Sequence, residues 1–597
     1  MMAQLPTQSK NGYPTAGQQE VSVDDIMTKI YFMNEEQWKI DSVSGNFDYV
    51  VVGSSFCCLS FIQQMIGNKP DAKILVMDRG AYFHPEHFQN LPPAYTFTVG
   101  GQAETFHWRI TEDTHNGEYI KFQHGMNNYF GGRSSFWSAW CPEPKDDEME
   151  GWPAELKAKV HSYFPAAKGV LNVVPANEIS SKESGADSHI FGALQQLVYK
   201  KLKPVPEKIA TVSRIEYAPL AVGAKMYRYE DYNKFSASGP ILNILIQKNQ
   251  ESKRNKTPQT LKVVMKCCVK KIVYDGRKAV ILDTSLGDFT LGSAKLILAM
   301  GTLPPTTLML NSSPFPELAN IGARFTSHFI SSIIARVPVT SITRKTNVFT
   351  AQKTEVEYTK VLQDNQGLLQ MAAIYVPGKD TVTGAQFHIQ LTAIIDDTPV
   401  ENIYDTMRHL PDVVAAPSFQ QLVSSHGYVV FVCACLGELD HTNSKNWYKK
   451  DNGEDITSNA VLQVVANDQD NSCWNAMDDT TFQVLEDYLT PGGDKTQIEY
   501  WSPELGNWNG VARPTKKERR VPGLVHEAST MWIGGDDDPT APVGLDYKFR
   551  GVENVYLTGG SLWPTGGAWN PTCAMSAMAM DLADQLSKLA PTPPGKK

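Results

Sequence analysis

The chain has 597 residues, which is more than one ordinary hydrophobic core accommodates, and it therefore predicts at least two structural domains. Hydrophobic residues make up 42%, aromatic residues 10% and charged residues 20% of the sequence, which is the balance of a folded protein and excludes a disordered one. The formal net charge of -9, without a stripe of lysine and arginine, argues against a nucleic-acid partner.

Cysteine usage and the amino-terminal segment predict a cellular compartment. The nine cysteines include no C-x-x-C pair, so we expect buried free thiols in a reducing environment and no metal site. The first residues of the chain are polar and lack the apolar core of a secretory signal peptide. We therefore expect an intracellular, cytoplasmic protein with no membrane partner.

A strand–turn–helix–strand unit follows a polar arm over residues 1–45. Residues 47–52 form a β-branched run typical of a buried strand, and residues 59–66 suit a helix. Residues 73–78 supply a second strand that ends in an acidic residue, Asp78. This order predicts a βαβ unit with a turn that faces a phosphate group.

The turn after the first strand carries a degraded dinucleotide fingerprint. Gly53 keeps the first glycine of the G-x-G-x-x-G pattern, while Ser55 and Cys58 occupy the second and third glycine positions. Because these side chains are small, the helix amino terminus can still offer its N–H groups to a diphosphate. Asp78 lies 25 residues after Gly53, near the spacing at which a carboxylate binds ribose hydroxyls.

Two further junctions have sequences suited to a cofactor site. Residues 131–140 begin with paired glycines and continue with small serines, which lets the main chain lie against a flat ring. Residues 294–313 read as a buried strand, a turn at Gly301 and a helix opened by proline.

His526 and Asn570 are the candidate catalytic pair near the carboxy terminus. A histidine with an ordinary pKa of roughly 6.5 accepts a proton near neutral pH, and an amide donates and accepts hydrogen bonds without changing charge. His526 precedes a glycine-rich return strand, and Asn570 precedes an apolar helix. Two such groups at the ends of neighbouring elements can hold an alcohol oxygen between a base and an orienting group.

Taken together, these blocks resemble the glucose-methanol-choline (GMC) flavoprotein oxidoreductases, and in outline the pyranose oxidase branch of that family. The resemblance runs from about Phe47 to Leu586, and it is most specific over residues 555–560, 564–565 and 570–572, which follow the family's order and spacing. Gly559 stands where most of the family has an acidic residue and where pyranose oxidases have a glycine pair.

The resemblance implies an extended FAD, with adenosine near Asp78, the pyrophosphate on the Gly53 turn, and the flavin between the 131–140 block and the carboxy-terminal block. By the same resemblance Ser138 lies near the reactive edge of the flavin. The residues implied to bind the cofactor are Gly53, Ser54, Ser55, Asp78, Arg79, Gly131, Gly132, Ser134, Ser138, Val269, Gly301, Gly560, Pro571 and Thr572.

Pyranose oxidases attach the flavin through a histidine in a Ser-Thr-His-Trp sequence, and this chain has Phe136 in the matching segment, residues 134–137. Phenylalanine forms no such bond, so we expect non-covalent FAD. A link from another histidine, for instance His107, is the alternative.

The expected fold class is α/β: a Rossmann-like FAD-binding domain and a discontinuous substrate-binding domain on a mixed or antiparallel sheet. The expected boundaries are an arm over 1–45, an FAD domain over 46–150, 255–335 and 520–588, a substrate domain over 151–254 and 336–519, and a tail over 589–597.

The expected reaction is oxidation of a CH–OH group in a sugar, a glycoside or another secondary alcohol. His526 removes the hydroxyl proton, Asn570 orients the substrate, hydride passes to flavin N5, and oxygen or another acceptor reoxidises the flavin. Three alternatives stay open: oxidation of an aromatic or secondary-metabolite alcohol, a non-redox lyase on the same FAD scaffold, and an assembly protein that no longer binds the nucleotide.

Several tryptophans are expected at the substrate pocket, namely Trp108, Trp140 and Trp569, with Trp569 narrowing it beside Asn570. The expected partners are a small-molecule substrate and an electron acceptor. Assembly into a homo-oligomer is left open.

Overall fold

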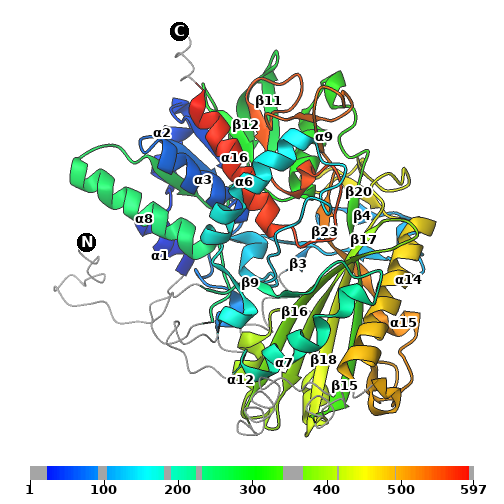
Figure 1. Cartoon of the computed structure of the whole chain (residues 1–597). Helices are drawn as coiled ribbons and strands as arrows, with labels where there is room; N and C mark the ends of the chain where they lie inside the picture. Colours follow the sequence, from blue (N-terminus) through cyan, green and yellow to red (C-terminus); the bar gives the residue numbers. More distant parts are fainter. Residues whose placement is uncertain are drawn as a thin grey trace, which may run out of the picture.

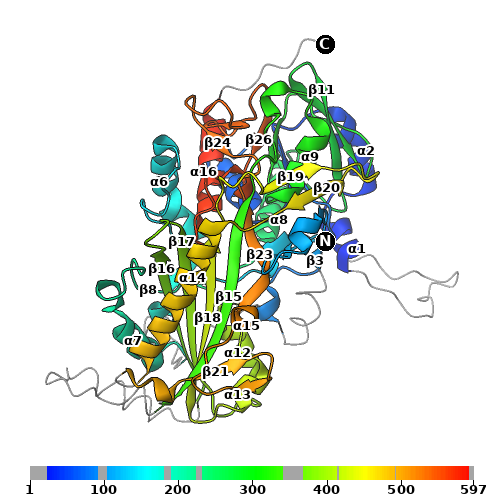
Figure 2. The same cartoon turned by 90° about the vertical axis from the view of Figure 1, so that its right-hand side faces the viewer.

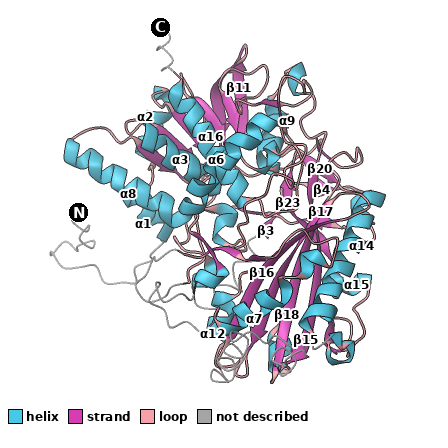
Figure 3. Ribbon diagram, in the orientation of Figure 1, coloured by secondary structure: helices cyan, strands magenta, loops and turns pink. Residues whose placement is uncertain are grey.

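The computed structural model describes residues 23–91, 104–179, 190–223, 232–339, 368–412, 416–490 and 493–589. Over these residues the chain forms two lobes, one built on a five-stranded parallel sheet and one on a nine-stranded sheet (Figures 1 and 3). We call them the parallel-sheet lobe and the antiparallel-sheet lobe. The expected α/β class is confirmed, while residues 1–22 of the arm and 590–597 of the tail lie outside the described residues.

The parallel-sheet lobe has the strand order β10-β2-β1-β14-β26, and every neighbouring pair is parallel. All four residues of β1 and of β2 are buried, because helices cover such a sheet on its faces. The strands are β1 (Tyr49–Val52), β2 (Ile74–Met77), β10 (Leu261–Val264), β14 (Lys295–Leu298) and β26 (Val555–Leu557).

Three helices pack together beside this sheet: α3 (Phe56–Asn68), α6 (Ala154–Val170) and α16 (Thr572–Lys588) (Figure 1). A three-stranded meander connects β10 to β14 in place of a helix, with strands β11 (Val269–Asp275), β12 (Lys278–Thr284) and β13 (Phe289–Thr290). Helix α2 (Glu35–Ser44), from the expected arm, packs on β13, where Trp38 contacts Phe289.

The packing adds two helices to the parallel-sheet lobe. Helix α6 lies in a segment expected to belong to the substrate domain, yet it packs against α16. Helix α8 (Ser238–Asn255), from the same segment, packs on α3 and β10. We therefore propose that the FAD domain includes both helices in addition to its expected segments.

The antiparallel-sheet lobe is centred on four long strands in the order β15-β18-β17-β16, each antiparallel to the next. They are β15 (Thr326–Pro338), β16 (Gln370–Lys379), β17 (Gln386–Ile395) and β18 (Tyr428–Glu438). The shorter strands of the sheet are β5 (Phe122–Gln123), β8 (Glu216–Tyr217), β21 (Glu499–Ser502), β22 (Asn507–Trp508) and β23 (Arg520–Ala528).

Side chains of the long strands alternate between two apolar clusters. Helices α7 (Ala193–Leu202) and α14 (Asp468–Gln483) lie over one face of the sheet (Figure 2) and share a cluster with Ile374 of β16. The neighbouring Tyr375 points to a second cluster, which also contains Trp140. The long strands are buried on both sides for this reason.

Strand β23 joins the two lobes. It pairs with β15 through two register shifts, on either side of His328, and then leads to β24 (Ile533–Gly534) and the carboxy-terminal helix. His526 lies in this irregular stretch with a φ of 64°, a left-handed conformation that is uncommon for a residue with a side chain. The irregular pairing changes the direction of the His526 side chain relative to the rest of the strand.

The glycine turn after β1 generates a stability prediction. Gly53 has a φ of 103°, and a Cβ there would lie 2.5 Å from the Ala299 carbonyl oxygen. We expect Gly53→Ala to destabilise the fold by at least about 2 kcal/mol through backbone strain, and to reduce the FAD content of the purified protein, read as the ratio of flavin to protein absorbance.

Gly67→Ala is the matched control, because Gly67 is an exposed helical residue with no atom within 4 Å of an added Cβ. This change should stabilise the helix by roughly 0.5–1 kcal/mol and leave FAD content unaltered. Equal FAD content and thermal midpoints in the two variants would contradict the role given to the Gly53 turn.

Candidate functional site

A cavity of about 570 Å³ opens where the carboxyl ends of the parallel strands meet the antiparallel sheet. Its lining extends from Asp78 and Arg79, which follow β2, to His526 and Asn570. Strands β15, β17, β18 and β23 contribute the wall nearest the latter pair. Ligands of open α/β sheets bind in this position, outside the carboxyl ends of the strands.

Most of the predicted site residues line this cavity. The cavity is lined by His526 and Asn570 and by Gly53, Ser54, Ser55, Asp78, Arg79, Gly132, Ser138, Val269, Gly301, Gly560, Pro571 and Thr572. Gly131 and Ser134 are the two predicted residues that do not line it. They lie one layer behind, where the Ser134 hydroxyl donates to the Gly131 carbonyl at 2.7 Å and accepts from the Ala237 N–H at 3.0 Å.

The Ser54 hydroxyl ties the first turn to the predicted ribose-binding acid. It donates to one oxygen of Asp78 at 2.5 Å and accepts the Gly131 N–H at 2.8 Å. The other oxygen of Asp78 accepts the Gly80 N–H at 2.7 Å. Burial raises the pKa of Asp78, and the hydrogen bonds from Ser54 and Gly80 oppose that rise. The carboxylate is thus held rigidly at the cavity wall.

His526 is held by a second histidine. Its Nδ1 lies 2.9 Å from Nδ1 of His328, and Nε2 of His328 lies 2.7 Å from the Gly567 carbonyl oxygen. Burial lowers the pKa of His526 well below its usual value, and His328, His388 and Arg133 add to the effect. Burial also lowers the pKa of His328, to about 4. Both imidazoles are therefore neutral at neutral pH.

Asn570 is held by a parallel set of contacts. Its Oδ1 accepts a hydrogen bond from Nε2 of Gln390 at 2.8 Å, and the same amide nitrogen lies 3.0 Å from Nε2 of His388. Nδ1 of His388 contacts the Ala568 carbonyl oxygen. Burial lowers the pKa of His388 to about 3, so this ring is neutral too.

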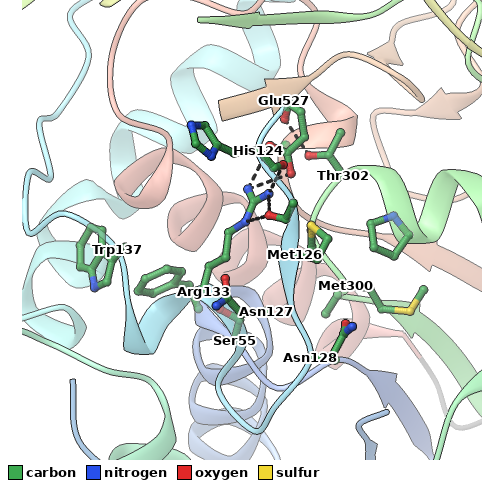
Figure 4. A pocket seen from close by; sticks show the side chains of 18 of the residues that line it. Ser55, His124, Met126, Asn127, Asn128, Arg133, Trp137, Met300, Thr302 and Glu527 are labelled. Atoms are coloured by element: carbon green, nitrogen blue, oxygen red, sulfur yellow. Dashed lines mark hydrogen bonds and ion pairs between the residues drawn. The ribbon is translucent and has the colours of Figure 1, made fainter. Parts of the chain in front are cut away.

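An ion pair beside the histidine, between Arg133 and Glu527, was not predicted from the sequence. One Arg133 nitrogen lies 3.0 Å from each carboxylate oxygen of Glu527, and the rest of the guanidinium donates to the carbonyls of His124 and Gly125 (Figure 4). Gln123 donates to the same carboxylate at 3.1 Å. Because its N–H groups are engaged, Arg133 acts as a clamp between the 124–133 segment and β23.

The expectation for the aromatic residues was wrong. Trp108, Trp140 and Trp569 do not line the cavity. Trp569 turns away from it and packs on Trp152 and Trp563, with its ring against Gly567.

The aromatic side chains that do line the cavity are Phe136, Trp137 and Trp563, with Tyr129 and Phe56. Phe136 thus lies in the cavity wall. His107, the alternative attachment point, does not line the cavity, and its Nε2 lies 2.8 Å from the Asn128 side chain.

The wall near His526 and Asn570 is largely apolar. It includes Ile330 of β15, and its other apolar members are Ala434, Leu436 and Val525. Gln390 is a polar exception on this side, and sequence reasoning missed it because its predicted strand showed only an alternation of apolar and polar residues. An apolar wall keeps bulk water away from the base and strengthens its polar contacts.

The donor set fits a flavin nucleotide. The amino terminus of α3 and the Gly53 turn leave main-chain N–H groups for a diphosphate, and Asp78 lies at the same end. At the other end, Oε1 of Gln390 and Nε1 of Trp563 are buried and have no hydrogen-bond partner among the described residues. Unpaired buried groups in a cavity wall are expected where a polar ligand supplies the partner.

Comparisons with known proteins agree with this geometry. Residues 497–579 match the carboxy-terminal model of the GMC oxidoreductase family. A dehydrogenase of Emericella nidulans, pkfF, is 22% identical over 613 aligned residues, which cover 91% of this chain and 94% of the relative.

Solved structures show the same fold at low identity. An FAD-dependent oxidoreductase from Chaetomium thermophilum superposes with a TM-score of 0.56 at 13% identity, covering 91% of this chain and 99% of the other. Formate oxidase from Aspergillus oryzae gives 0.54 at 13% identity, covering 90% and 98%. Pyridoxine 4-oxidase from Mesorbium loti gives 0.51 at 14% identity, covering 90% and 99%.

None of the helices in the described part of the chain combines the length and the apolar character needed to cross a lipid bilayer. The cavity fits a flavin nucleotide, and the carboxy-terminal match and the fold point the same way: the chain resembles the GMC oxidoreductases, and FAD is the cofactor that this resemblance implies.

Proposed function

We propose that this protein oxidises the CH–OH group of a small alcohol, with His526 as the base and Asn570 as the orienting group. The observation that carries the proposal is the placement of both side chains on the wall of one cavity, beside an apolar surface and at the end opposite Asp78. The electron acceptor that completes the cycle is oxygen or another small molecule.

FAD supplies the hydride acceptor when it is bound, and the Gly53 turn, Asp78 and Gly132 would hold it. Asn570 donates a hydrogen bond from its amide to the substrate oxygen, because its own oxygen is occupied by Gln390. His526 accepts the hydroxyl proton at Nε2, because Nδ1 is occupied by His328. A positioned base of this kind contributes roughly 10²- to 10⁴-fold to the rate.

Among CH–OH donors, we propose that alcohols with an apolar or aromatic body are preferred over sugars. The wall around the catalytic pair is formed by Ile330, Ala434, Leu436 and Val525. Two aromatic residues, Phe136 and Trp137, line the same cavity. A pyranose would leave several of its hydroxyl groups without partners against such a surface, at a cost of about 1–3 kcal/mol for each buried group. One structural neighbour, pyridoxine 4-oxidase, carries an aromatic alcohol in its name.

The preference can be measured by flavin bleaching without oxygen. We expect benzylic and other apolar alcohols to reduce the bound flavin at lower concentrations than glucose or its glycosides do. A sugar that bleaches the flavin more readily than every benzylic alcohol in the panel would contradict the preference. Cleavage of a cyanohydrin without any bleaching would favour the lyase alternative.

Replacement of His526 tests the base. With the best alcohol of that panel, His526→Ala should retain FAD and slow anaerobic flavin reduction by roughly 10²- to 10⁴-fold in stopped flow, because the substitution removes the proton acceptor proposed to act beside Asn570. His115→Ala, at the end of a short helix away from the cavity, is the control and should reduce the flavin at the wild-type rate. An unchanged reduction rate in His526→Ala would exclude the base role.

We also propose that FAD is held non-covalently, since Phe136 lines the cavity and stands where the resemblance to pyranose oxidases implies the flavin-linked histidine. Precipitation of the protein in acid should therefore release the yellow colour into the supernatant. Phe136→His provides a comparison, since it restores a nucleophilic side chain at that position. Flavin that stays in the wild-type pellet would refute non-covalent binding.

A further inference from the structure

Two consecutive carbonyl groups receive hydrogen bonds from two different buried histidines. Gly567 accepts from His328, which is on β15, and Ala568 accepts from His388, which is on β17. These histidines contact the two members of the candidate catalytic pair, one directly and one through Gln390. A carbonyl oxygen only accepts, so each of these contacts decides which ring nitrogen carries the proton.

The first set of contacts determines the proton position on His526. Because Gly567 accepts, Nε2 of His328 carries the proton, and Nδ1 of this neutral ring is bare. The Nδ1 atoms of His328 and His526 are 2.9 Å apart, so the proton between them belongs to His526. Nε2 of His526 is therefore the bare nitrogen, in the ring that lines the cavity.

The second set of contacts determines the orientation of the Asn570 amide. Because Ala568 accepts, Nδ1 of His388 carries the proton and its Nε2 is bare. That bare nitrogen accepts from the amide nitrogen of Gln390, which donates its other hydrogen to Oδ1 of Asn570. Asn570 is left with its N–H groups as the part of the amide that is free to meet a substrate oxygen.

We propose that the Gly567 and Ala568 carbonyls, acting through His328 and His388 as positioning residues, set His526 as a proton acceptor and Asn570 as a hydrogen-bond donor. This inference rests on the proposed function, since it assigns the proton pattern that alcohol oxidation requires. The short loop with Gly567 and Ala568 thereby determines that His526 accepts and Asn570 donates a hydrogen bond at the substrate.

The loop that carries the two carbonyls is itself held in place. The Gly567 N–H donates to a carboxylate oxygen of Glu438 at 2.8 Å. Gly567 has a φ of 58°, and its α-carbon lies so close to the Trp569 ring that an added Cβ would come within 2.0 Å of it. The packing of Trp569 away from the cavity thus positions Gly567 and Ala568, whose carbonyl groups accept hydrogen bonds from the two histidines.

The charged and titratable groups around His526 leave this pattern intact. His328 and His388 face it from β15 and β17, and both are neutral. Arg133 faces it from the 132–135 turn, where Glu527 engages its guanidinium. No carboxylate contacts either ring nitrogen of His526 among the hydrogen bonds and ion pairs of the described residues.

The proton positions can be observed without turnover. In FAD-loaded protein labelled with ¹⁵N-histidine, we expect His526 to show a protonated Nδ1 and a bare Nε2, and His328 the reverse; His526→Asn and His328→Phe identify the two sets of signals. A protonated Nε2 on His526 would overturn the inference. If the expected pattern is present and no alcohol reduces the flavin, the proposed function fails while the assignment of the protons stands.

Two substitutions at His328 separate a positioning role from simple packing. His328→Phe keeps a ring but removes the acceptor, so we expect flavin reduction to slow by about 10²-fold with FAD retained. His328→Asp can only accept, so it should recover at least about tenfold of that loss. Its carboxylate would also stabilise the imidazolium, so the pH below which reduction slows should be higher than in the wild type, whose His526 pKa is depressed.

If His328 only fills space, the buried charge of His328→Asp makes it as slow as His328→Phe or slower, and that result would refute the positioning role. His388→Phe is the matched control, because it removes an equally buried ring from the other set of contacts. It should leave the protonated Nδ1 and the bare Nε2 of His526 as they are in the wild type. A proton moved from Nδ1 to Nε2 of His526 in His388→Phe would count against two separate sets of contacts.

Discussion

The close approach of main chain to main chain at the carboxyl ends of β1, β14 and β26 is the constraint on which the site depends. A Cβ at Gly53 would lie 2.5 Å from the Ala299 carbonyl oxygen, and one at Gly559 would lie 2.9 Å from that of Gly301. Because these turns have glycine, the ends of the strands lie close enough together to form one continuous side of the cavity. The glycine at 559 follows directly from this contact.

The second requirement is a fixed position of the nine-stranded sheet relative to the ends of the parallel strands. Strand β23 pairs with β15 through an irregular stretch, and the buried Glu527 holds Arg133 across the cavity wall. Removing Arg133 would leave the buried carboxylate of Glu527 without its charged partner. The pair therefore specifies where the strand lies relative to the flavin side, rather than adding much stability of its own.

Sequence reasoning recovered the parts of the site that depend on local pattern. The Gly53 turn, Asp78 and the strand–turn–helix at Gly301 are each encoded within a short stretch, and all of them line the cavity. The contacts it missed join residues far apart in the chain: Arg133 and Glu527 are 394 positions apart, and His328 and His526 are 198 apart. Such pairs depend on sheet register, which no local pattern reports.

The same limit explains the wrong expectation for Trp569. Its neighbour Asn570 lines the cavity, but consecutive residues of an irregular loop do not share a direction, and the ring packs instead with Trp152 and Trp563. The expected α/β class and the mixed or antiparallel second sheet were predictable because strand alternation and βαβ order are properties of the chain alone.

The groups that anchor both histidines are peptide oxygens, which every amino acid possesses. Replacing the side chains of that loop would not remove these oxygens. A change in the backbone conformation of the loop would be needed to move them away from the histidines. Enzyme variants could therefore gain or lose activity through distant changes in how Trp569 or Glu438 is accommodated, while each residue usually inspected for chemistry stays the same.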